Sequence, residues 1–71
     1  MNQIAIINRI FRERSRQDKL HTWDAATNKM AVAAEELGEI AAAMQGQGDL
    51  QEELVQLAAV CVRWLEELYE Q

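Results

Sequence analysis

The chain contains no proline and only three glycines among its 71 residues, and this absence constrains its fold more than any other feature. Proline and glycine are the residues that most disfavour an α-helix, so the helical conformation is accessible along nearly the whole chain. Polar and glycine-containing breaks divide the chain into three expected helices, over about residues 2–19, 24–45 and 49–69. We therefore expect a single all-α domain.

Capping residues mark the ends of these expected helices. Thr22 or Asp24 is expected to begin the second helix by accepting a hydrogen bond from an early backbone N–H. A glycine in segment 45–48 is expected to end it in the left-handed conformation. Asp49 is expected to cap the third helix, with Glu52 as its partner in a capping-box-like pair.

Apolar residues recur at heptad spacing along the second and third expected helices. This heptad seam consists of Met30, Ala33, Ala34, Leu37, Ile40, Ala41 and Met44, followed by Leu54, Leu57, Ala58, Cys61, Trp64, Leu65 and Leu68. A connection of about four residues favours an antiparallel helical hairpin. The second helix is apolar almost all round, and a core this small rarely gives more than about 3–5 kcal/mol of stability. We predict a three-helix protomer that assembles into a helix-bundle oligomer, a dimer or a tetramer.

Composition and charge exclude several classes of protein. A single cysteine, Cys61, rules out a disulfide framework and a cysteine-based zinc site, and it favours the cytoplasm. No apolar run approaches the length of a membrane span, and the first residues lack the pattern of a signal peptide. The net charge of −5 argues against binding to a nucleic acid polymer. We expect neither a membrane nor a nucleic acid as partner.

Charge is nevertheless distributed unevenly along the chain. Five of the seven basic residues lie within residues 9–19, whereas nine of the twelve acidic residues lie from Glu35 onward. The basic stretch has two interpretations, which the sequence leaves open. It is either a solvated helix face that pairs with acidic neighbours or a cationic rim that attracts a polyphosphate.

Two acidic motifs, one on each of the later helices, point to a metal site. Glu36 with Glu39, and Glu53 with Gln56, are each spaced three residues apart, so each pair shares one helical face. If these faces meet, three carboxylates and one amide converge, and such oxygen ligands suit magnesium or manganese. Glu36 and Glu39 also lie among alanines, where an uncompensated carboxylate is costly. The alternative is an exposed acidic flank, with Gln56 as plain polar packing.

The order of the motifs, EELGE and then EELVQ, resembles the MazG-like all-α nucleoside triphosphate pyrophosphohydrolases, whose signature is EExxE followed by ExxD on the next helix. The resemblance covers about residues 14–68. It implies magnesium- or manganese-dependent hydrolysis of a nucleoside triphosphate to a monophosphate and pyrophosphate, as in nucleotide-pool house-cleaning. By position, it implies metal ligands at Glu36, Glu39, Glu53 and Gln56, where Gln56 replaces the Asp of the family pattern. The glutamine removes one negative charge, so weaker metal binding is expected.

The resemblance also implies roles in catalysis and substrate binding. Glu35 matches the first acid of the motif, and Glu35 or Glu36 would orient or deprotonate the attacking water. Lys29, Trp23 and Arg16 are the expected substrate-binding residues. Lys29 as a salt-bridge partner and Trp23 as a packing residue are the alternatives.

Proteins of this family commonly have further helices that contact the nucleotide. In this protein, a partner subunit is expected to supply those contacts, or they are missing. Two other functions therefore remain open. One is a catalytically inactive MazG-like assembly module, and the other is a partner-binding or antitoxin-like adaptor that uses residues 9–19.

Overall fold

The computed structural model describes residues 2–20 and 27–70, and it contains three α-helices and no strand in these ranges. The helices are α1 (Gln3–Leu20), α2 (Lys29–Met44) and α3 (Leu50–Tyr69). The expected all-α class is therefore confirmed for the described residues. The bounds of α1 and α3 lie within one residue of the expected ranges, whereas α2 begins later.

The start of α2 is set by Asn28 and not by a residue near position 24. Asn28 has an extended backbone, and its side-chain oxygen accepts a hydrogen bond of 3.0 Å from the N–H of Ala31. Asparagine is among the strongest N-cap residues, so the helix begins at Lys29. The caps proposed from the sequence, Thr22 and Asp24, lie outside the described residues.

The end of α2 has the hydrogen bonds of a Schellman motif. The N–H of Gly46 donates to the carbonyl of Ala43, and the N–H of Gln47 donates to that of Ala42, both at 3.0 Å. Gly46 has a φ of 88°, which is the left-handed conformation expected for a glycine here. This tight ending lets the chain turn directly into α3.

Asp49 caps α3, as the sequence predicts. Its side chain accepts hydrogen bonds from the N–H groups of Gln51 at 3.0 Å and Glu52 at 3.3 Å. The carboxylate of Glu52 pairs with Arg9 of α1 at 2.8 Å. Glu52 was expected to act as the partner in a capping box, but it instead links two helices.

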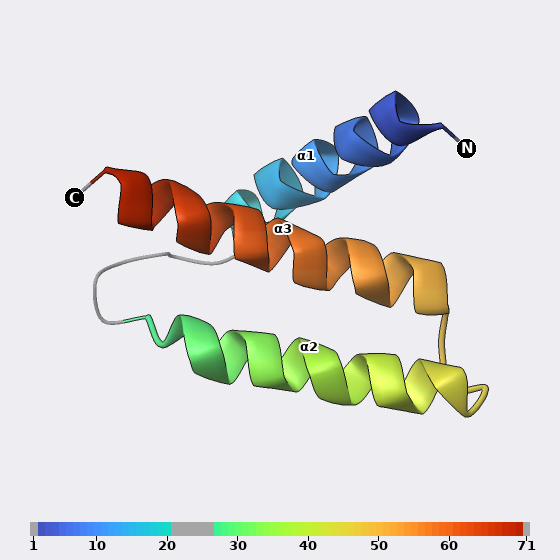
Figure 1. The fold of residues 1–71 in the computed structure, drawn as a ribbon. Coiled ribbons are helices and arrows are strands. Elements are labelled where there is room, and N and C mark those ends of the chain that lie inside the picture. Colours follow the sequence, from blue (N-terminus) through green and yellow to red (C-terminus); the bar gives the residue numbers. More distant parts are fainter. Residues whose placement is uncertain (1, 21–26, 71) are drawn as a thin grey trace.

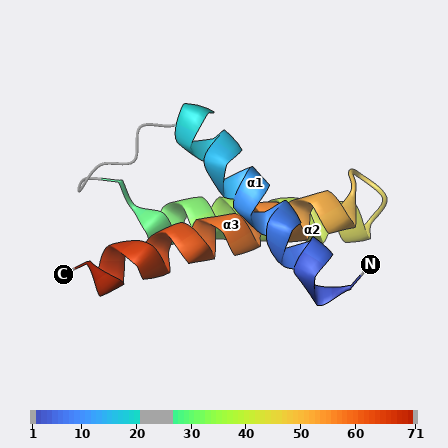
Figure 2. The same cartoon turned by 90° about the horizontal axis from the view of Figure 1, so that it is seen from above.

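The central element is α3, because it packs against both other helices, whereas α1 and α2 do not pack against each other in the part of the chain that the structure describes. In Figure 1, α2 and α3 lie side by side, and the turn between them reverses the direction of the chain. Figure 2 shows α1 crossing over α3 at a wide angle, on the side away from α2. The basic helix α1 and the acidic helix α2 thus both contact α3.

The interior is built from small residues, and most of the heptad seam is exposed. The buried apolar residues are Ala43, Val55, Ala59 and Val60. The large seam residues that face solvent are Met30, Leu37, Met44, Leu54, Leu65 and Leu68. The seam is therefore only partly buried: Ile40, Leu57 and Trp64 are half-buried, whereas its other large side chains remain exposed.

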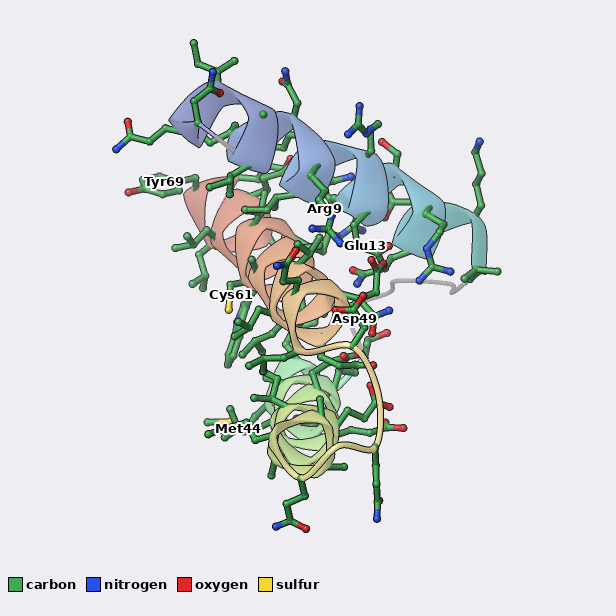
Figure 3. All side chains as sticks on the ribbon, turned by 90° about the vertical axis from the view of Figure 1, so that its right-hand side faces the viewer. Arg9, Glu13, Met44, Asp49, Cys61 and Tyr69 are labelled. Carbon is green, nitrogen blue, oxygen red and sulfur yellow. The ribbon has the colours of Figure 1, made fainter. Side chains whose placement is uncertain are left out.

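The molecule has two chemically different sides. In Figure 3, Met44 and Cys61 project from the same side of the α2–α3 pair, whereas Arg9 and Glu13 lie between α1 and α3 toward the side of Asp49. No helix in the described residues is long and apolar enough to cross a lipid bilayer.

Candidate metal centre

Three carboxylates from two helices meet beside the turn between α2 and α3. Glu36 and Glu39 come from α2, and Glu53 comes from the first turn of α3. One oxygen atom from each lies within 4.8 Å of the others. Two ligands on opposite sides of a cation, each at about 2.0–2.6 Å, are about 4–5 Å apart, so these oxygens need little movement to share one ion.

The side chain of Gln56 completes this group, which we call the carboxylate cluster. When its amide is assigned from its hydrogen-bond partners, the nitrogen donates to Glu53 Oε2 at 3.0 Å and to Glu36 Oε2 at 3.2 Å. The structure thus brings together all four residues that the sequence suggested as ligands. The opposite orientation of the amide would present the carbonyl oxygen, which is the atom that coordinates a cation.

Two carboxylates of the cluster have raised pKa values. Burial, followed by the charge of Glu39, raises the pKa of Glu36 to about 7 from an ordinary value of 4.5. A hydrogen bond with Glu39, followed by burial, raises the pKa of Glu53. Like charges at this spacing disfavour joint ionisation, and a divalent cation relieves that repulsion.

The donor set therefore fits a hard divalent cation. All of its ligand atoms are oxygens, the Glu36 and Glu53 side chains are half-buried, and Glu39 is exposed. The exposed acidic flank remains the alternative interpretation, because Glu39 is exposed and acidic groups also cluster without a cation. Here the carboxylates come from two helices and share an amide, which is an arrangement that oxygen-ligated cations use.

The other residues suggested for catalysis and substrate binding do not belong to this cluster. Glu35 is exposed and is not one of the three converging carboxylates, although its charge contributes to the raised pKa of Glu36, after burial and Glu39. Lys29 is buried and its Nζ lies 2.9 Å from Glu67 Oε2, so it forms the salt bridge that was its alternative role. Trp23 lies outside the described residues.

Arg16 belongs to a second feature, a hollow between α1 and α3 that we call the arginine cleft. Its lining residues are Arg9, Arg12, Glu13, Arg16, Glu52 and Val55, and its volume is about 460 Å³. The sequence grouped these arginines only as a basic stretch. Their spacing of three and then four residues, which places them along one side of a helix, is the signal that could have identified the cleft.

Ion pairs account for much of the basic stretch. Arg14 pairs with Asp18 at 2.6 Å and with Glu66, and Arg9 pairs with Glu52 at 2.8 Å. The interpretation of this stretch as a face that pairs with acidic neighbours is therefore correct for these arginines. Arg12 makes no ion pair with any residue in ranges 2–20 and 27–70.

Comparison with known proteins found no counterpart: no protein-family model, no curated protein and no solved structure matches this chain.

Proposed function

We propose that the protein is a metal-dependent nucleoside triphosphate pyrophosphohydrolase, which converts a nucleoside or deoxynucleoside triphosphate and water into the monophosphate and pyrophosphate. The supporting observation is the convergence of Glu36, Glu39 and Glu53 within 4.8 Å. The resemblance of the two acidic motifs, which contain these same glutamates, to the MazG-like signature also supports it. The proposed compartment is the cytoplasm, and the proposed role is the control of the nucleotide pool.

The proposed cofactor is magnesium, or manganese in its place. Glu36, Glu39, Glu53 and the carbonyl oxygen of Gln56 would hold it, and when bound it supplies neutralising charge for phosphate oxygens and acidifies a water molecule. Oxygen ligands of this kind suit both ions.

A carboxylate in or beside the cluster would act as the proton acceptor. Glu35 or Glu36 would take a proton from the water whose oxygen attacks the α-phosphorus. The bond from the α-phosphorus to the bridging oxygen breaks, and the electron pair leaves with pyrophosphate. Because water is the nucleophile, the reaction requires no nucleophilic side chain.

Among the predicted substrate-binding residues, Arg16 is best placed for the phosphates. It lines the arginine cleft, where Glu13 fixes its guanidinium through hydrogen bonds of 2.7 and 2.8 Å. Lys29 would first have to leave Glu67, to which it is paired at 2.9 Å. Trp23 remains a proposed contact for the nucleobase.

Self-association is part of this proposal. The exposed seam residues Leu37, Leu65 and Leu68 are 58%, 52% and 52% exposed, which is unusual for large apolar side chains on two neighbouring helices. A second copy that packs against this side would bury them in a helix bundle, as a dimer or a tetramer.

The same apolar side supports a second candidate function, an assembly module without activity. Gln56 also favours it, because the amide removes one negative charge from the cluster and cannot act as a base. The two candidates differ in metal binding, since a pure assembly module has no need of a cation.

The deciding experiment is a screen for pyrophosphate release from canonical and modified nucleoside triphosphates with magnesium present. Glu39→Gln should lower activity by roughly 100-fold or more, because it removes a ligand charge while leaving an exposed side chain of the same shape. Glu70→Gln, with the same change in charge at the far end of α3, is the matched control and should retain activity.

A calorimetric titration with manganese separates the two candidates if no substrate is found. Specific uptake that Glu39→Gln abolishes supports the enzyme. Absence of both activity and specific uptake would overturn the enzyme and favour the two non-catalytic functions, the assembly module and the adaptor.

A further inference from the structure

The arginine cleft is a built feature of the crossing between α1 and α3. Arg9, Arg12 and Arg16 lie along one side of α1, and two acids, Glu13 and Glu52, lie among them. Its volume of about 460 Å³ is within the range of about 300–1,000 Å³ that is typical of small-molecule sites. Both helices contribute charged groups, so the cleft exists only because the helices cross here.

Ion pairs hold two of the arginines in fixed orientations, and each of the two keeps N–H groups that these pairs do not use. Buried Glu13 binds the Nε and Nη2 groups of Arg16 at 2.7 and 2.8 Å, and Glu52 binds Nη2 of Arg9 at 2.8 Å. A guanidinium has five N–H donors, so each arginine keeps several for another acceptor. Planar forks oriented in this way suit the paired oxygens of phosphate groups.

The third arginine supplies the uncompensated charge. Arg12 is exposed and has no ion-pair partner in the described ranges, so the three cations of the cleft exceed its two carboxylates. The chain as a whole carries a net charge of −5. The cleft is thus a local cationic site on an acidic protein, and a local excess of this kind attracts anions.

The cleft and the carboxylate cluster are neighbours on α3. Glu52 lines the cleft and the next residue, Glu53, belongs to the cluster. Arg16 donates two hydrogen bonds to Glu13, and these bonds together with the charge of Glu13 raise the pKa of Arg16, with smaller contributions from the charges of Glu52 and Glu36. Gln17 of α1 also donates a hydrogen bond to the main-chain carbonyl of Gln56. The same turn of α3 therefore contributes one acid to each feature.

We propose that the arginine cleft binds a diphosphate group, with Arg12 and Arg16 as its principal donors. The identity of that group rests on the proposed function, in which it is the β,γ-diphosphate of the substrate and then the pyrophosphate product. Glu13 is a positioning residue, because its buried carboxylate accepts the Nε and Nη2 hydrogen bonds of Arg16 and so orients that guanidinium.

The test is a calorimetric titration of the full chain with inorganic pyrophosphate in EDTA, which removes the metal-dependent reaction. The wild-type protein should bind pyrophosphate more tightly than orthophosphate, because the diphosphate carries more charge and more oxygen acceptors for the guanidinium groups of the cleft. Arg12→Gln should weaken binding by roughly tenfold, as expected for the loss of a charge-assisted contact. Because Arg12 is exposed and makes no ion pair with the described residues, this variant should fold normally, which circular dichroism checks.

Lys19→Gln is the matched control, since it makes the same change in charge on α1 outside the cleft. It should change the affinity by less than about twofold at physiological salt, where distant charges are screened. An equal loss in both variants, or no pyrophosphate binding by the wild type, would overturn the proposal.

The outcome also separates this proposal from the proposed function. Pyrophosphate binding that depends on Arg12 supports the cleft even if no triphosphate is hydrolysed. Conversely, if the protein hydrolyses a triphosphate and pyrophosphate inhibits Arg12→Gln as strongly as the wild type, the proposed enzymatic function is supported. Diphosphate binding in the arginine cleft is then overturned.

Discussion

Gln17 on α1 donates a hydrogen bond from Nε2 to the main-chain carbonyl oxygen of Gln56 on α3, 3.1 Å away. The side chain of Gln56 contacts Glu36 and Glu53, so this bond ties α1 to the turn of α3 that carries the carboxylate cluster. Gln17 is 5% exposed, and its Oε1 has no hydrogen-bond partner among the described residues. One end of a buried amide is therefore bonded and the other is not.

Replacing Gln17 with methionine should leave the free energy of unfolding unchanged or raise it by up to about 2 kcal/mol. The variant loses one hydrogen bond, worth about 1 kcal/mol, and removes an unpaired buried acceptor that costs about 1–3 kcal/mol. Urea unfolding measures the difference. Gln17→Glu is the contrasting variant and should be strongly destabilising, because it buries a charge. A loss of more than about 2 kcal/mol in Gln17→Met would show that Oε1 has a partner, such as an ordered water.

Without metal, the protein should become less stable as pH rises from about 4.5 to 7. Glu36 has a pKa of about 7 in the folded chain and 4.5 ordinarily, so between these values the folded state binds the additional proton. Stability falls with pH wherever the folded state holds more protons, and this contribution is fully present only below the ordinary pKa. The measurement is the urea midpoint in EDTA across this range.

Glu36→Gln should reduce this slope, because the amide does not titrate; Glu53, whose pKa is also raised, accounts for the slope that remains. Glu35→Gln, which alters an exposed neighbour, should largely retain it. Equal slopes in the wild type and in Glu36→Gln would show that Glu36 is ordinarily ionised in the folded protein.

Features of this fold that depend on neighbouring residues were predictable from the sequence. Asp49 caps α3 and Gly46 ends α2, because a cap is determined by a few consecutive residues. The spacing of Glu36 and Glu39 placed both carboxylates on one face by helical geometry alone. The start of α2 was missed because Asp24 and Asn28 are both good caps, and local pattern does not rank them.

Features that depend on how helices pack were not predictable. The heptad spacing identified Leu37 and Leu65 as members of an apolar stripe, but it did not specify what that stripe packs against. The buried core consists of small residues such as Ala59, which is fully buried, and most of the stripe is exposed. The arginine cleft was missed for the same reason, since the pairing of Arg9 with Glu52 exists only where α1 crosses α3.

The exposed stripe predicts the effect of charge on assembly. Leu65→Glu should convert an oligomer into a monomer while retaining helical structure, because it places a charge in the centre of an apolar interface. Ile4→Glu is the control, since Ile4 is 71% exposed on α1 and lies outside the stripe. Sedimentation velocity at micromolar concentration gives the mass of each species. A well-folded wild-type monomer would contradict the proposed self-association.

The amide at position 56 should determine how tightly the cluster holds a cation. Its nitrogen, 3.0 Å from Glu53 and 3.2 Å from Glu36, neutralises some of their repulsion when no cation is present. Gln56→Glu keeps the length of the side chain, removes both donors and adds a negative charge. It should lower the stability of the metal-free protein, because crowded carboxylates resist joint ionisation.

The same substitution should tighten manganese binding by roughly tenfold, because a fourth carboxylate adds attraction at close range. The two effects have opposite signs, so thermal unfolding should show Gln56→Glu below the wild type in EDTA and closer to it or above it in saturating manganese. Gln56→Met separates charge from hydrogen bonding, since it removes the donors without adding a charge and should not gain affinity. If Gln56→Glu changes neither manganese affinity nor metal-free stability, then Gln56 does not act with Glu36 and Glu53, and the carboxylate cluster is not a cation site.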